Sequence, residues 1–385
     1  MQRRMLNKQN IFFVVTTLAM VGMVLFGLSG NPQFANRQNG STSFLSARVV
    51  EIVDDQTGLN EAGVRVGRQQ LMVRLLSGPR RGDIVSAQNM LFPIEHAVYA
   101  QVGQRLIIFF EQLPGAPDYD YFAHVQSYDR SMGIYIVILL FIGLLAVVFG
   151  KTGLRAGFGL VFTFIILIFL LLPLIVNGGP PAILTVLCAL CIIVVSLIAI
   201  MGFQKKTYVS IVGACIGIGF YSLFYVVISA ALRITGFNVQ EVDLLIVAGF
   251  HIGVSQLLFS AILIASLGAL MDVAVSIASV TAELSAANPK TGFKELFRSG
   301  MTIGRDIIGS SSNTLILAFT GTFFITLILF SVNNVQYNVL INRVDIGIEV
   351  LRAVSATAAM VLCAPATALI GSRVFASGSG RKKRT

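Results

Sequence analysis

The stretch AILTVLCALCIIVVSLIAIM, residues 182–201, contains no charged side chain. A helix that crosses the hydrocarbon core of a bilayer needs about 20 predominantly apolar residues. The stretch lies inside a longer charge-free run, 156–204, and similar runs extend over 207–232 and 307–342. The sequence therefore predicts a helical protein with several membrane crossings.

The overall composition points to the same class. Of 385 residues, 55% are hydrophobic and 12% are charged, against roughly 25% charged in an ordinary soluble domain. A formal net charge of +10 suits cationic loops that set topology and contact anionic lipid headgroups. Because no basic stripe interleaved with aromatic residues is present, we expect membrane lipids as partners and no nucleic acid.

The hydrophobic runs predict an all-α polytopic membrane helix bundle with about eight crossings. The predicted crossings are 11–28, 132–150, 157–176, 182–201, 208–232, 244–270, 313–332 and 348–371. The first has a longer apolar run than a cleaved signal peptide and no small-residue cleavage site after it. We therefore expect an uncleaved anchor, with a cleaved signal peptide as the alternative.

Lysine and arginine predict the orientation, because short cytoplasmic loops are enriched in them. They cluster before the first crossing, in every second connection and in the tail, and are scarce in the connections between. The clusters are Arg3, Arg4 and Lys8; Lys151 and Arg155; Lys205 and Lys206; Lys290, Lys294, Arg298 and Arg305; Arg373, Arg381, Lys382, Lys383 and Arg384. We expect both termini in the cytoplasm and the protein in a cell membrane.

This orientation divides the chain into a basic N-terminus with its anchor (1–30), an extracytoplasmic domain (31–130), a membrane domain (131–373) and a basic cytoplasmic tail (374–385). In 31–130, short apolar runs at 47–53, 69–76, 83–85 and 105–110 alternate with turn signals, as in antiparallel strands. The segment SGPRRG, 77–82, predicts a hairpin turn, because Pro fixes φ and Gly tolerates positive φ. The domain is predicted to be small and β-rich, either OB-like or a sandwich.

A polar line interrupts the apolar pattern in GALMDVAVSIASVTAEL, residues 268–284. Asp272, Ser276, Ser279 and Glu283 are spaced so that all four lie within roughly 60° on one face of a helix. The line begins at the cytoplasmic end of the sixth predicted crossing, where a carboxylate costs least.

A second polar line lies in RSGMTIGRDIIGSSSNTLILAF, residues 298–319, where Asp306, Ser310 and Asn313 share a face. Both lines start at the same membrane surface, so we expect them to face each other around a hydrated inner mouth, with Arg305 or Arg298 as counter-charge. The alternative is a structural ion pair between Asp272 and one of these arginines that pins two helices together.

Other features allow two interpretations each. Residues 291–298 suit a short helix at the inner membrane surface, as a gate or an anchor. His251, the one histidine inside a predicted crossing, suits either a proton relay or a helix-to-helix hydrogen bond. Gly213, Gly217 and Gly219 form a small face that favours helix packing.

No enzyme, cofactor or metal site is expected. The sequence contains no HExxH, no serine with a plausible histidine base and no nucleotide-binding loop. Cys188 and Cys191 have CxxC spacing, but they lie mid-crossing without a histidine or charged neighbour. They are therefore interpreted as packing residues.

Several motifs resemble the YibE/F family of bacterial multi-pass membrane proteins. These are GALMDVAVS at 268–276, AEL at 282–284, ANP at 287–289, ELFRSGM at 295–301, IGRD at 303–306 and NTL at 313–315. The exported domain and its SGPxxG turn resemble the longer, YibE-like members, and the likeness extends over nearly the whole chain. The resemblance implies the architecture and, as partner, either a shorter YibF-like membrane subunit or a second copy. It implies no catalytic or ligand residues.

Two functions follow from these features. The first is a transporter or channel component for a small solute or ion, with a carboxylate-lined cytoplasmic mouth. The second is an envelope receptor or assembly scaffold whose exported domain binds a partner. A membrane-embedded enzyme is the least supported class.

Overall fold

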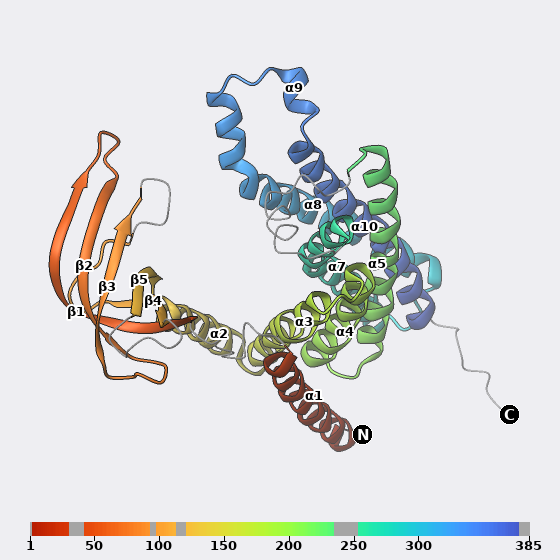
Figure 1. The fold of residues 1–385 in the computed structure, drawn as a ribbon. Coiled ribbons are helices and arrows are strands. Elements are labelled where there is room, and N and C mark those ends of the chain that lie inside the picture. The colour runs from red at the N-terminus through yellow and green to blue at the C-terminus, as the bar shows by residue number, and fades with distance from the viewer. Residues whose placement is uncertain (1, 31–41, 93–97, 113–120, 235–252, 377–385) are drawn as a thin grey trace. The chain divides into compact units, whose positions relative to one another are not determined.

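A computed structural model describes residues 2–30, 42–92, 98–112, 121–234 and 253–376 (Figure 1). The chain forms two compact units. One is Pro32–Leu144, and the other combines Met1–Asn31 with Leu145–Thr385.

The first unit contains a closed five-stranded barrel. Its strands are β1 (Thr42–Leu59), β2 (Arg65–Leu75), β3 (Ile84–Leu91), β4 (Arg105–Gln112) and β5 (Tyr121–Tyr128), joined in the order β1-β2-β3-β5-β4. Neighbouring strands are antiparallel except for the β3–β5 pair. The prediction of a small β-rich domain is confirmed, and of the two alternatives the chain adopts the OB-like barrel, whose closure leaves no open sheet edge.

Alternation of side chains builds the barrel core. On β3, every second residue from Val85 to Leu91 is buried, as expected where successive side chains point to opposite faces. The core is formed by Leu45, Ala47, Val49, Leu71, Val73, Leu75, Val85, Ala87, Leu91, Val98, Ala100, Leu106, Ile108, Phe110 and Ala123.

The predicted turn at 77–82 joins β2 to β3 and is confirmed. Gly78 and Gly82 have φ of 84° and 102°, a region that favours glycine. A Cβ at Gly78 would also lie 2.7 Å from Leu45 Cδ2. The turn therefore needs glycine for its conformation and for its close approach to β1.

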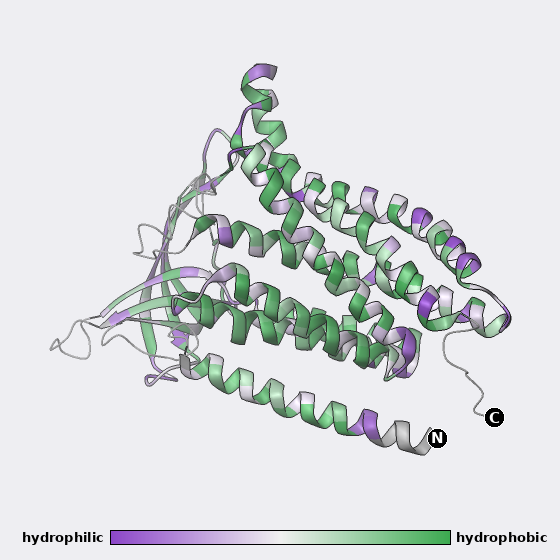
Figure 2. Ribbon diagram, turned by 90° about the vertical axis from the view of Figure 1, so that its right-hand side faces the viewer, coloured by the Kyte–Doolittle hydropathy of each residue, from purple (hydrophilic) through white to green (hydrophobic). Residues whose placement is uncertain are grey.

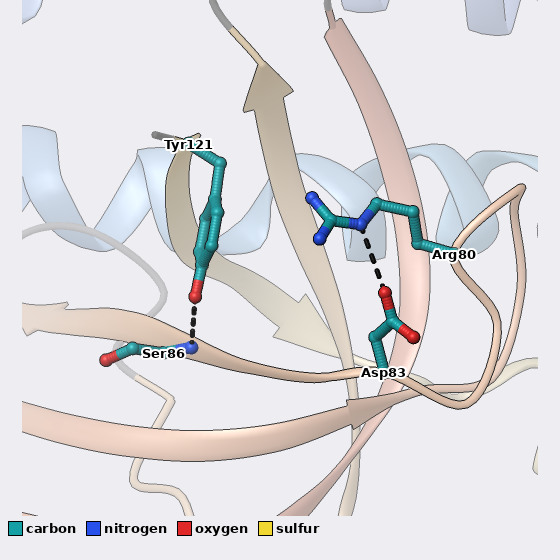
Figure 3. A network of polar contacts seen from close by, with 4 residues as sticks. All are labelled: Arg80, Asp83, Ser86 and Tyr121. Atoms are coloured by element: carbon teal, nitrogen blue, oxygen red, sulfur yellow. Dashed lines mark hydrogen bonds and ion pairs between the residues drawn. The ribbon is translucent and has the colours of Figure 1, made fainter. Parts of the chain in front are cut away.

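Arg80 and its neighbours hold this turn against the barrel end (Figure 3). Arg80 Nε donates to Asp83 Oδ2 at 3.1 Å, and its guanidinium carbon lies 5.9 Å from the ring centroids of both Phe110 and Tyr121. The backbone N–H of Ser86 donates to the Tyr121 hydroxyl at 2.9 Å (Figure 3). These contacts tie the turn to β3, β4 and β5.

Long apolar helices make up most of the rest. They are α1 (Gln2–Gly30), α2 (Ser131–Ile165), a π-helical turn (Ile166–Leu171), α3 (Leu172–Val176), α4 (Pro181–Met201), α5 (Lys205–Ala231), α7 (Val254–Ala287), α8 (Phe293–Val332), α9 (Tyr337–Ile341) and α10 (Val344–Phe375). Seven helical stretches of the described residues are long and apolar enough to cross a membrane. Figure 2 shows them hydrophobic over most of their length, which confirms the predicted class.

The count of seven differs from the predicted eight because two predicted crossings fall within one helical run, Ser131–Val176. Its 46 residues correspond to about 69 Å of helix, twice the thickness of a bilayer core. Gly150 divides the run with φ 57° and ψ −132°. The π-helical turn directly precedes Pro173, whose ring cannot continue a regular helical ladder.

α7 and α8 extend beyond the predicted crossings. α7 ends at Ala287, just before Asn288 and Pro289, as proline disfavours helix in the preceding residue. Residues 244–252 of the predicted sixth crossing lie outside the described part. The prediction of a separate surface helix over 291–298 is wrong: its residues from Phe293 are the first turns of the continuous α8.

The centre of the second unit is formed by α5, α7 and α10, with α4 and α8 packed on α7 (Figure 1). Two glycines of α5 allow the close approach. A Cβ at Gly213 would lie 2.1 Å from Thr367 Oγ1 of α10, and one at Gly217 would lie 2.8 Å from Leu270 Cδ2 of α7. A Cβ at Gly219 would have nothing outside its own helix turn within 4 Å. The predicted packing role therefore holds for the first two glycines only.

Candidate functional site

The inner face of α7 is closed. Val273, Ala274, Ile277, Ala278 and Thr281 are each 0% exposed. Thr281 of this face lies against α8 and α10: a Cβ at Gly300 of α8 would lie 3.1 Å from Thr281 Cγ2, and one at Gly371 of α10 would lie 2.7 Å from Thr281 Oγ1. Glycine and alanine allow this tight packing, as in other membrane helix pairs.

The outer face of α7 carries the first polar line. Asp272 and Glu283 are exposed, and Ser276 and Ser279 are half-buried. Asp272 lies about 140° around the helix from Ile277, at 100° per residue. Toward the N-terminus the same face continues through small exposed residues, Ala261, Ala265 and Gly268.

The second polar line also faces outward. Asp306, Ser310 and Asn313 of α8 are exposed, whereas Gly304 is buried. Asp306 and Asn313 lie about 160° and 180° around the helix from Gly304. The polar line and the packing face are thus on opposite sides of α8.

The two polar lines lie at the same level along the helix axes, but they do not face each other. α7 contacts α8 where Ile277 meets Gly304 and where Thr281 meets Gly300, so the helices run antiparallel. Counting from these contacts, Asp272 lies at the level of Gly309, next to Ser310. The expectation of two lines facing each other within one chain is therefore not met, because glycines occupy the shared contact.

The expected counter-charges are not in place. The ion pairs among the described residues are Arg80–Asp83, Arg343–Asp345 and Arg352–Glu349, so neither Arg305 nor Arg298 pairs with Asp272. The alternative of a structural ion pair is not met either. Both polar lines present unpaired side chains at the surface of the described chain.

α10 carries polar groups that sequence reasoning missed. Arg352 Nη1 lies 3.0 Å from Glu349 Oε1, and its guanidinium carbon lies 5.6 Å from the ring centroid of Phe319 on α8. These are the only charged residues in the predicted crossing 348–371. That isolation was the available signal, since ionisable groups inside crossings are rare and usually functional.

Buried oxygens without a hydrogen-bond partner among the described residues also occur here. They include Ser312 Oγ of α8 and Thr357 Oγ1 of α10. Gly304 packs by Ala364 and Gly300 by Ala368, so α8 and α10 run antiparallel, and counting from these contacts places Ser312 and Thr357 at nearly the same level. Unpaired buried polar atoms are normally satisfied by water, which makes this level a candidate for hydration.

Two further features complete the site. His251 lies outside the described residues, so its predicted role is untested. Within the described ranges, no group of three His, Cys, Asp or Glu residues could hold a metal ion. What the site offers chemically is carboxylates, hydroxyls and an amide in a line, groups that attract cations and replace their hydration shell.

The family model for YibE/F-like proteins matches residues 137–377. The chain belongs to this family. No curated protein and no solved structure matches it. The matched region of the YibE/F-like family begins inside α2, so it includes both polar lines but leaves out the barrel. The family match is thus narrower than the likeness over nearly the whole chain that the sequence suggested. This membership and the apolar helices identify an integral membrane protein.

Proposed function

We propose that this YibE/F-like protein is a component of a transporter or channel, with its pathway along the outer faces of α7 and α8. The observation that carries the proposal is the continuous outward line of Asp306, Ser310 and Asn313 on α8. The side chains of these three residues have no hydrogen-bonding or charged partner among the described residues. A structural seam would instead bury and pair such groups.

The position of this line suits a mouth at the membrane edge. α8 has 40 residues, about 60 Å of helix, so it extends well beyond a bilayer core of about 30 Å. Its C-terminal half is apolar and exposed, with Leu317 and Ile325 at 61% and 79%. Asp306 precedes this half, and Asn313 lies at its start, so the line leads from water toward the bilayer.

A second copy of the chain is the proposed occupant of the other wall. The exposed small residues Ala261, Ala265 and Gly268 of α7 offer few side-chain atoms to lipid and permit close helix approach. They continue into the Asp272 line on the same face. Packing two copies along this face would put two sets of carboxylates around one mouth, which favours a cation or a proton-coupled solute.

Ion flux into proteoliposomes containing the full chain tests the proposal. Proton and metal-cation indicators report uptake for wild type and for Asp306→Asn and Asp272→Asn. The control is Asp345→Asn, because Asp345 is paired with Arg343 at 2.7 Å and lies outside both lines. We expect flux to fall at least about tenfold in the two line variants, as when a pathway charge is lost. Equal flux in all three variants would contradict the proposal.

An envelope receptor or scaffold is the second candidate, and one feature of the barrel favours it. Aromatic side chains cross three strands on the outer surface: the rings of Phe44 and Phe109 lie 5.4 Å apart, and those of Phe109 and His124 lie 4.7 Å apart. Phe44 and Phe122 are 62% and 53% exposed. Exposed aromatic patches are typical of binding surfaces.

The two candidate functions make opposite predictions for the phenotype of cells that carry the variants. If the barrel is a receptor, Phe44→Ser with Phe122→Ser abolishes the phenotype and the two Asp→Asn variants leave it intact. If the pathway on α7 and α8 is the function, the Asp→Asn variants abolish the phenotype and the aromatic variant keeps it.

A further inference from the structure

Three arginines form a row across neighbouring strands on the outside of the barrel. Arg48 of β1 is the register partner of Arg74 of β2 and also of Arg105 of β4. All three are exposed, and each is next to a buried core residue on its strand. Neighbouring strands lie about 4.8 Å apart, so the backbones of the three arginines lie within about 10 Å of one another.

Such a row is unfavourable for the barrel alone. Like charges directly opposite each other on neighbouring strands repel and destabilise the sheet. Among the described residues, none of the three arginines forms an ion pair. Beside the row, Asp129 has its pKa lowered first by the Ser131 hydroxyl, then by Ser46 and last by Arg105. The row is thus an excess of positive charge that an external anion can neutralise.

The row lies beside the start of the apolar helix α2. The backbone N–H of Asp129 donates to the Arg105 carbonyl at 3.1 Å. Asp129 Oδ2 accepts from Ser46 Oγ of β1 at 2.7 Å, and Oδ1 accepts from the Ser131 N–H at 3.1 Å. Ser131 is the first residue of α2. One carboxylate therefore fastens the barrel to the first turn of the helix, within the same unit.

Helix α2 in turn fixes the height of the row relative to a membrane. From Met132 to Leu140 every residue is exposed and none is charged, as in a segment surrounded by lipid. Arg48 follows Ser46 by about 7 Å along β1. The row is therefore close to the plane in which the chain enters the bilayer, which is the plane of the lipid headgroups.

We infer that Arg48, Arg74 and Arg105 form a docking surface for the phosphate groups of anionic membrane lipids. Guanidinium groups bind phosphate through paired, charge-assisted hydrogen bonds. Each basic residue near an anionic membrane surface adds to the attraction between protein and lipid. The surface holds the barrel against the membrane, and this role is independent of the proposed transport pathway.

The test uses the full chain in lipid nanodiscs. The four native cysteines are replaced by alanine, and a fluorophore is attached at Val50→Cys, an exposed position near Arg48. Quenching by a nitroxide on the lipid headgroups reports the distance from the membrane surface. Discs contain either zwitterionic lipid alone or added phosphatidylglycerol.

We expect quenching to rise with phosphatidylglycerol content and to fall at high salt, which screens exposed charges. The triple variant Arg48→Gln, Arg74→Gln, Arg105→Gln should lose the lipid-dependent part by about threefold or more. The matched comparison is Arg48→Gln with Arg74→Gln against Arg65→Gln with Arg68→Gln, which lie opposite Leu59 and Gln56 at the other end of the β1–β2 pair. Each removes two charges, and only the first should lose the lipid-dependent quenching. Millimolar inorganic phosphate should not abolish the effect, since membrane lipid is the ligand.

Three outcomes would overturn the inference: no dependence on phosphatidylglycerol in the wild type, equal loss in the two matched double variants, or displacement by inorganic phosphate. Hydrogen exchange of the barrel amides in zwitterionic discs shows whether each variant is folded. The row variant should be protected at least as well as wild type there, because repulsion has been removed. A single Arg48→Lys variant, which keeps the charge, should retain most of the quenching.

Discussion

The barrel and the α7–α8 pair treat their polar side chains in opposite ways. In the barrel, Gln69 and Asn89 are 1% exposed, and they bond to each other and to the segment from Val98 to Ala100. Asn89 Nδ2 donates to Gln69 Oε1 at 2.9 Å, and the Ala100 N–H donates to the same oxygen at 3.0 Å. On α7 and α8, the polar line residues are exposed or half-buried and unpaired.

This difference separates a structural network from a candidate site. Buried polar groups that satisfy one another fix a fold but leave no capacity for a ligand. Exposed polar groups on helices with apolar neighbours retain that capacity, at a cost if lipid covers them. The contrast therefore assigns Gln69 and Asn89 to stability and the α7 and α8 lines to function.

The largest expected effect comes from disrupting the close packing of α5 against α10. Gly213→Val should destabilise the membrane unit by about 3 kcal/mol, because overpacking against α10 forces helices apart. Thermal unfolding in detergent checks this value. Gly219→Val is the control, since a Cβ at Gly219 would have nothing outside its own helix turn within 4 Å. An equal loss in both variants would mean that valine in α5, not its contact with Thr367, is the cause.

A somewhat smaller effect is expected in the barrel network. Gln69→Leu leaves the Ala100 N–H and one N–H of the Asn89 amide without an acceptor, while the other N–H still donates to the Val98 carbonyl, and this should cost about 2 kcal/mol. Hydrogen exchange of the β2 and β3 amides measures the change. Gln88→Leu alters the exposed neighbour of Asn89 and should change stability by less than about 0.5 kcal/mol. If Gln69→Leu were equally mild, the network would not be structural.

The junction of barrel and α2 should show a pH dependence. The pKa of Asp129 is lowered by hydrogen bonds from Ser131 and Ser46, so its stabilising contribution is present above the unfolded pKa of about 3.9 and is lost as pH falls through the folded value. Ser46→Ala should raise the pKa of Asp129 and reduce this acid-range loss of stability. Hydrogen exchange of β1 and β5 from pH 5 downward measures it. An unchanged pH profile would contradict the junction's role.

The smallest effect on stability is expected in the polar lines themselves. Asp272→Asn and Asp306→Asn should shift the unfolding free energy by less than about 0.5 kcal/mol, as for exposed sites without partners. Thermal unfolding of the two variants beside Gly304→Leu makes the comparison direct, because a Cβ at Gly304 would lie 3.2 Å from Ile277 Cδ1. A large destabilisation in either carboxylate variant would assign that residue to structure.

Much of this architecture could be predicted from the sequence. The charge-free runs were sufficient for the apolar helices, and period-two alternation with the SGPRRG turn was sufficient for the β-rich domain. The residues of each polar line share one helix face, as local periodicity required. The direction in which each face points depends on tertiary packing, and that was not visible locally.

The prediction that the two polar lines face each other was wrong for a specific reason. Gly300 and Gly304 have the spacing of a close-packing motif. They are next to Arg305 and Asp306 in the sequence, and the prediction assigned the contact with α7 to the polar residues and not to the glycines. The continuity of α8 was missed because residues 291–298 suited a short helix at the membrane surface, whereas packing against α7 and α10 stabilises one continuous helix there. Glu349 and Arg352 were overlooked although they are alone in an apolar run.

Thiol accessibility along the two faces of α7 tests the central claim most directly. In the chain with its native cysteines replaced, single cysteines at Asp272, Ser276, Val273 and Ile277 are exposed to a small membrane-impermeant reagent in vesicles of both orientations. If the outer face of α7 is lined by water, positions 272 and 276 should label fast from one side only, and positions 273 and 277 should not label. Unreactive positions 272 and 276, or equal reaction on both faces, would contradict a water-lined pathway on the outer face of α7.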